Sequence, residues 1–176
     1  MSLLKLLGWA DASPPAPERL AAAIQARLGD LTPARAEFVA AFAGLLVRVA
    51  YADRSISEAE RAVLAPLLAA NAGLPAPEAE TVVEIVTHRA TTLEGISYAT
   101  LTRAFNAIAT DEEKERLIDC LFAVATAEGS ISVVEDDEVR AVARALLLSH
   151  QQFIAVRSRY KDQLDVIQAA RQTRGG

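Results

Sequence analysis

Residues 52–60 read ADRSISEAE, and residues 127–135, which lie 75 positions later, read AEGSISVVE. Both copies have an acidic residue second, Ser-Ile-Ser in the middle and a Glu at the end. An apolar run precedes each copy, at residues 45–50 and 120–125. A Ser followed three positions later by a Glu is typical of the beginning of a helix. The repeat therefore predicts two helix–acidic turn–helix units related by pseudo-symmetry.

Helical periodicity extends in both directions from the two copies. Apolar residues recur at helical spacing, and no segment alternates over more than four residues, so we expect an all-α compact bundle of about seven or eight helices. The expected helices lie at about 18–28, 33–52, 58–71, 77–90, 97–109, 111–127 and 133–148, with a last helix starting at His150. We expect three regions: an N-terminal apolar segment with a Pro-rich link at 1–17, the helical domain at 18–165 and a flexible C-terminal tail at 166–176.

The two turns have a purely structural interpretation. Ser57 with Glu60, and Ser132 with Glu135, predict capping boxes, in which each side chain bonds to a backbone N–H of the other residue. Gly129 fits a left-handed residue after the end of a helix. This interpretation accounts for the Ser, Glu and Gly residues, but it leaves the acidic residue at the second position of each copy unexplained.

A cation site is the second interpretation of the turns. Asp53 and Glu128 follow the end of a helix, where a negative charge opposes the helix dipole. Asp53 with Glu60, and Glu128 with Glu135, would bring carboxylates together across each turn. Ligand sets made only of oxygen atoms favour hard cations such as Ca²⁺, Mg²⁺ or Mn²⁺. The residues alone leave both interpretations open.

The pattern Ala-acid-Gly-x-Ile-Ser-x-x-Glu, present twice in a helical chain, resembles the TerB (tellurite resistance) superfamily over about residues 33–160. Its most specific parts are LFAVA at 121–125, Glu135-Asp136, and LSHQQFI at 148–154. The resemblance implies a compact all-helical fold, an association with tellurite and stress resistance, a metal site at the acidic turns and no enzymatic activity. The chain departs from the pattern at Arg54, where the family has Gly, and at Glu128, where it has Asp.

Charge is segregated in the second half of the chain. Residues 111–138 carry a net charge of −8, and residues 139–176 a net charge of +5. One interpretation is a solvated surface with intramolecular ion pairs. The other is a metal-free interaction module that docks a protein partner through its acidic face and basic C-terminal helix. The residues that we assign to such a partner surface are Asp136, Asp137, Glu138, Arg157 and Arg159.

Several other classes of protein are disfavoured. A net charge of −5 argues against a nucleic-acid partner. The single cysteine, Cys120, excludes an internal disulfide and a Cys-based zinc cage. The longest uncharged apolar run, residues 38–47, is too short to span a bilayer, so we expect a cytoplasmic protein. His88 and His150 belong to no catalytic motif, so we expect no enzyme and no cofactor beyond a divalent cation.

Overall fold

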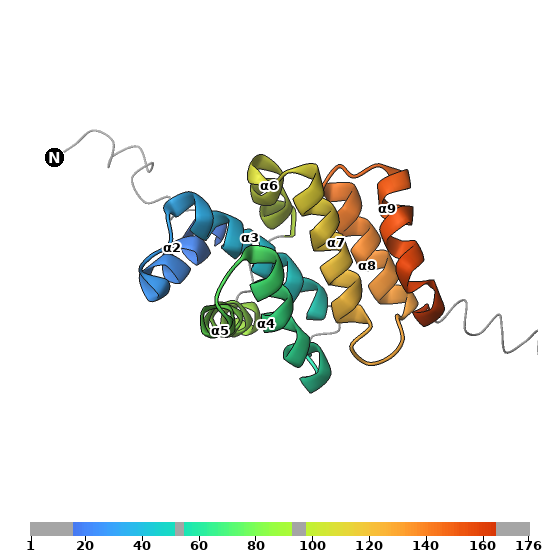
Figure 1. Ribbon diagram of the computed structural model, residues 1–176, viewed down its shortest axis with the longest axis horizontal. Coiled ribbons are helices and arrows are strands. Elements are labelled where there is room, and N and C mark those ends of the chain that lie inside the picture. Colours follow the sequence, from blue (N-terminus) through green and yellow to red (C-terminus); the bar gives the residue numbers. More distant parts are fainter. Residues whose placement is uncertain (1–15, 52–54, 93–97, 165–176) are drawn as a thin grey trace, which may run out of the picture.

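The structure, a computed structural model, describes residues 16–51, 55–92 and 98–164. Within these ranges the chain forms eight α-helices and a short 3₁₀-helix, η1, and its only β pairing is a single bridge (Figure 1). The elements are α2 (Ala16–Leu28), α3 (Pro33–Ala50), α4 (Glu58–Ala72), α5 (Ala76–Thr92), α6 (Tyr98–Ile108), α7 (Asp111–Ala125), α8 (Val133–Ala145), α9 (His150–Arg157) and η1 (Ser158–Gln163). The all-α bundle of seven or eight helices is therefore confirmed.

Helix α3 is the central element of the domain. It packs against α2, α4, α5, α6, α7 and α8, and most of its residues are buried. Small residues let these neighbours approach closely. A Cβ atom at Gly44, for example, would lie 2.9 Å from Leu101 Cδ2 of α6. Phe38 and Phe42 of α3 meet Phe105 of α6 with ring centroids 5.6 and 6.0 Å away, respectively, and these rings form the core of this half of the domain.

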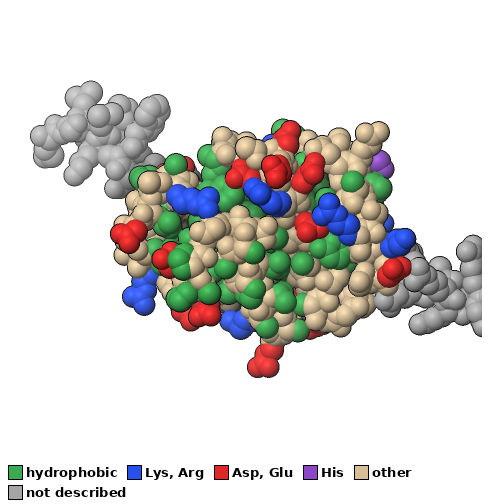
Figure 2. Space-filling view, in the orientation of Figure 1, with side chains coloured by type: hydrophobic (Ala, Val, Ile, Leu, Met, Phe, Trp, Pro, Cys, Tyr) green, Lys and Arg blue, Asp and Glu red, His purple; other side chains and the backbone are tan. Residues whose placement is uncertain are grey.

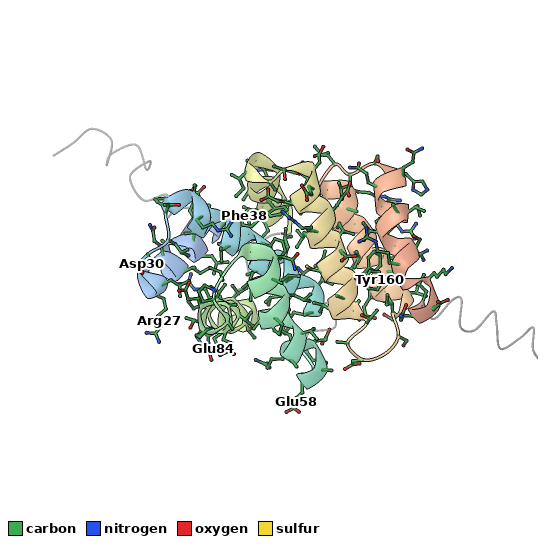
Figure 3. All side chains as sticks on the ribbon, in the orientation of Figure 1. Arg27, Asp30, Phe38, Glu58, Glu84 and Tyr160 are labelled. Atoms are coloured by element: carbon green, nitrogen blue, oxygen red, sulfur yellow. The ribbon has the colours of Figure 1, made fainter. Side chains whose placement is uncertain are left out.

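A second aromatic cluster joins α7 to the C-terminal elements. The ring of Phe122 lies 5.9 Å from that of Phe153 and stacks at 5.3 Å on Tyr160. Tyr160 points back into the domain, and its hydroxyl donates a hydrogen bond to the carbonyl oxygen of Asp119 at 3.0 Å (Figure 3). These contacts hold α9 and η1 against the body.

The two copies of the sequence repeat each begin a helix, α4 and α8. Both helices begin with a Ser–Glu capping box. A pseudo-symmetric arrangement of the whole helix–turn–helix units stays a prediction. The second copy has one further connection: the N–H of Ile131 donates to the carbonyl oxygen of Gln163 at 2.7 Å, within the bridge that pairs Ile131 with Leu164. The C-terminal end of the described chain therefore holds the second acidic turn.

Parts of the predicted organisation lie outside the described residues. These parts are the N-terminal apolar segment, Asp53 with Arg54, and the C-terminal tail after residue 165. The domain boundaries stay predictions. No helix in the described ranges is long and apolar enough to cross a membrane.

Candidate functional site

The two acidic turns, 75 residues apart in sequence, line one hollow in the structure. The beginning of α4 and the loop from α7 to α8 lie at the same edge of the molecule (Figure 1). Between them is a cavity of about 370 Å³, lined by three carboxylates and three Ser side chains. The carboxylates are Glu60, Glu128 and Glu135. The other described residues that line it are apolar, including Val134, which is 69% exposed.

Capping boxes position Glu60 and Glu135, as the sequence predicts. Glu60 Oε2 accepts from the N–H of Ser57 at 2.8 Å, and the N–H of Glu60 donates to Ser57 Oγ at 3.1 Å. The corresponding distances between Ser132 and Glu135 are 2.8 and 3.2 Å. Both boxes satisfy backbone donors that the first turn of a helix leaves without a partner. The same geometry brings both carboxylates to the wall of the hollow.

Glu128 reaches the hollow by a different route. Helix α7 ends at Ala125, and the chain turns through Gly129, whose φ of 98° is left-handed, as the sequence predicts. The N–H of Gly129 donates to the carbonyl oxygen of Thr126 at 2.8 Å and closes this turn. Glu128 is exposed and forms no ion pair among the residues that the structure describes. Among the described residues that line the hollow, it is therefore the one carboxylate that no capping box occupies.

The hollow gathers negative charge without forming a tight ligand set. Within the described ranges, no group of three or more His, Cys, Asp or Glu side chains is close enough to hold a metal ion. Of the four residues predicted as metal ligands, the structure brings three to one cavity, and Asp53 lies outside the described residues. The hollow therefore combines three Glu side chains with a volume of about 370 Å³. A cation bound there stays a prediction.

Two residues assigned to a partner surface, Asp136 and Arg157, bind each other inside the domain. Arg157 Nε and Nη2 lie 2.7 and 2.8 Å from Asp136 Oδ1 and Oδ2. Arg140 Nη2 adds a third hydrogen bond to Oδ2 at 3.1 Å. Burial would raise the pKa of Asp136, but the hydrogen bonds and charges of Arg157 and Arg140 outweigh it and hold this pKa below its ordinary value. This ion pair gives both residues a structural role.

Arg140 completes the cluster that Asp136 and Arg157 form, although the sequence pattern does not identify this residue. Arg140 follows Asp136 by four positions on α8, a spacing at which helical side chains meet. Its guanidinium also lies over the ring of Phe153 of α9, 5.5 Å from the centroid. Arg140 therefore helps to join α8 to α9, and the i, i+4 spacing is the signal that could have identified it.

The other three residues of the predicted partner surface lie nearer the solvent. Asp137 is exposed and lies 3.9 Å from Arg140 Nε. Glu138 is half-buried. Arg159 Nη1 pairs with Asp119 Oδ1 at 2.9 Å on the surface. Figure 2 shows acidic side chains near the upper edge of the molecule, where α7 begins, with Lys and Arg side chains among them. The beginning of α8, which carries Asp137 and Glu138, follows the loop at the opposite edge (Figure 1). A protein partner for this surface stays a prediction.

The fold and the hollow define an all-helical protein with a negatively charged surface site. Residues 39–158 match the family model for Tellurite resistance protein TerB, which is more than half of the chain, so the protein belongs to the TerB family. Membership relates it to tellurite resistance and places it in a family whose members are generally not catalytic. The match includes both acidic turns and begins after α2. No curated protein and no solved structure matches the chain.

Proposed function

We propose that this TerB-family protein acts in tellurite and stress resistance without catalysis, by holding a hydrated divalent cation in the acidic hollow. One observation carries the proposal: two acidic turns that are distant in sequence line the same cavity. The sequence suggests two separate sites, one at each turn. A shared cavity favours a single site to which both turns contribute.

A hydrated cation suits the hollow better than a dehydrated one. The carboxylates are not gathered closely enough for direct ligation by three of them. Mg²⁺ gives up its water reluctantly and is commonly bound through one or two carboxylates, with several waters retained. Six waters need roughly 180 Å³ at about 30 Å³ each, which fits in a cavity of about 370 Å³. Mn²⁺ has the same preference for oxygen ligands.

The three carboxylates would have unequal roles. Glu128 takes no part in a capping box, and we assign it the most direct contact with the cation. Glu60 and Glu135 each use Oε2 to cap their own helix, so they contribute chiefly their negative charge and the wall of the site. Binding of a cation would then connect the beginning of α4 to that of α8.

Calorimetric titration of Mg²⁺, Mn²⁺ and Ca²⁺ into the chelator-treated full chain tests this proposal. We expect saturable binding that Glu128→Gln weakens by roughly tenfold or more, the equivalent of about 1.4 kcal/mol. The double variant Glu60→Gln/Glu135→Gln should also weaken it, while keeping Gln residues that can still cap. Glu58→Gln is the matched control, because Glu58 is in the first turn of α4 but points away from the body (Figure 3).

Two results would contradict the cation proposal. One is the absence of saturable binding by wild type, and the other is equal weakening by Glu58→Gln and Glu128→Gln, which would indicate general surface charge. The alternative of a metal-free interaction module would then be favoured. Salt-sensitive binding of a defined basic protein partner that chelator does not affect would support this alternative.

A further inference from the structure

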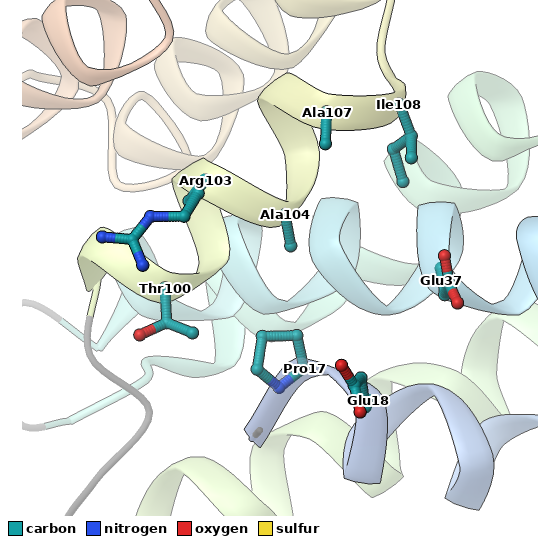
Figure 4. Close-up of a pocket in the computed structure, with 8 residues that line it drawn as sticks. All are labelled: Pro17, Glu18, Glu37, Thr100, Arg103, Ala104, Ala107 and Ile108. Carbon is teal, nitrogen blue, oxygen red and sulfur yellow. The ribbon is translucent and has the colours of Figure 1, made fainter. Parts of the chain in front are cut away.

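A second cavity, of about 330 Å³, lies between α2, α3 and α6 (Figure 4). Its apolar wall is formed by Pro17 of α2 and by Ala104, Ala107 and Ile108 of α6. Ile108 is 40% exposed although it is a large apolar residue. The cavity shares no lining residue with the acidic hollow. Its volume is within the range of about 300–1,000 Å³ that is usual for binding pockets. We call it the α2–α6 groove.

The charges on the rim indicate the chemistry of an occupant. Glu18 and Glu37 extend from α2 and α3 beside the apolar wall, and Arg103 lies toward the other end of the groove (Figure 4). Both carboxylates are exposed, and neither forms an ion pair within the described residues. An apolar segment with a positive charge near Glu18 and Glu37 would complement this rim.

We propose that residues 1–9 of this chain, MSLLKLLGW, dock in the α2–α6 groove. Six of these residues are large and apolar: Met1, Leu3, Leu4, Leu6, Leu7 and Trp9. The only charged side chain among them is Lys5, which matches the two carboxylates on the rim. The segment therefore has both the apolar surface and the positive charge that the groove would bind.

The covalent connection places this segment close to the groove. The described structure begins at Ala16, and the next residue, Pro17, already lines the cavity. Only residues 10–15 lie between, and six residues span at most about 20 Å. The 11 residues of α6 extend over about 16 Å. A tether of this length keeps the segment near the groove at an effective concentration in the millimolar range.

Trp9 provides the test, because it is the only tryptophan of the protein. We expect the full chain to show blue-shifted Trp9 emission and weak acrylamide quenching in comparison with a free peptide of residues 1–16. Ala107→Glu places a carboxylate in the groove at an exposed position, where it should not disturb the core. It should raise the quenching of Trp9 to the level of the free peptide. Ala141→Glu, at an exposed position of α8, is the control and should quench like wild type.

Four outcomes would overturn the proposal, and the last of them needs lipid vesicles. The first is quenching of wild type equal to that of the free peptide, and the second is no effect of Ala107→Glu. The third is protection of Trp9 that disappears on dilution, which would indicate a second copy of the chain as the occupant. Anionic phosphatidylglycerol vesicles complete the test. A blue shift that appears only on addition of vesicles would show that residues 1–9 bind a lipid surface instead.

Discussion

Arg157, the last residue of α9, donates two hydrogen bonds to Asp136, in the first turn of α8, at 2.7 and 2.8 Å. Asp136 directly follows Glu135, which lines the acidic hollow. The pair therefore fixes the turn of helix that carries one wall of the candidate site. Paired hydrogen bonds between a guanidinium and a carboxylate are among the strongest that side chains form, and they set the orientation of both groups.

Removal of Arg157 should destabilise the domain. Asp136 is 8% exposed in the structure, and in Arg157→Met it would keep only Arg140 as a partner. A buried carboxylate that loses its main partner costs roughly 2 kcal/mol or more of the free energy of unfolding. Urea denaturation measures this loss. Arg159→Met is the control, because its ion pair with Asp119 is exposed and should contribute less than about 1 kcal/mol. Equal losses in both variants would contradict the structural role of the buried pair.

Acid should remove the contribution of Asp136 to stability. The pKa of Asp136 is lower in the folded protein than its ordinary value of 3.8. The unfolded chain therefore binds the proton first as the pH falls, and the stabilisation is lost between the unfolded and folded pKa values. The difference in unfolding free energy between wild type and Asp136→Asn should be constant above about pH 5 and should shrink below about pH 4. A difference that does not change down to about pH 2 would contradict the lowered pKa.

Glycine should stabilise the end of α8. Leu147 has a φ of 62°, in the left-handed region, and its side chain is 80% exposed. The N–H groups of Leu147 and Leu148 donate to the carbonyl oxygens of Arg144 and Ala143, as in a Schellman motif that usually has Gly at this position. Leu147→Gly should raise the free energy of unfolding by about 1 kcal/mol, measured by urea denaturation. Leu147→Ala keeps the strain and should leave stability unchanged, so an equal gain in both variants would contradict this explanation.

The thiol of Cys120 should be inert in the folded protein. Burial, and secondly the negative charge of Asp119, raise its pKa to about 12. At about pH 8 almost no thiolate is present, and the sulfur is also inaccessible to reagents. Iodoacetamide should therefore label Cys120 only after denaturation in urea, as mass spectrometry would show. Rapid labelling of the native protein would contradict both its burial and its raised pKa.

Features of the fold that depend on neighbouring residues are predictable from the sequence. A capping box needs only a Ser and a Glu three positions apart. Both predicted capping boxes form, Ser57 with Glu60 and Ser132 with Glu135. The end of α8 differs, because the sequence predicts a helix to about residue 148 and the structure ends it at Ala145. No glycine marks this end, since Leu147 takes the left-handed conformation itself.

The arrangement of the site depends on tertiary contacts that cannot be predicted from the sequence pattern. Glu60 and Glu128 come to one hollow only because α4 and α7 pack against each other around α3. Asp136 and Arg157 are 21 positions apart, so a local charge pattern cannot identify them as partners. The sequence therefore predicts which charged residues matter. It does not predict that Glu60 and Glu128 line the same hollow, or that Asp136 pairs with Arg157.

Native mass spectrometry of the chelator-treated chain with Mn²⁺ tests the central claim, that the two acidic turns share one cation site. We predict one specifically bound ion per chain, with unchanged occupancy in Glu58→Gln and strongly reduced occupancy in Glu128→Gln. Two ions per chain would contradict the claim, because each turn would then bind its own cation. A chain that binds no ion would contradict cation binding altogether.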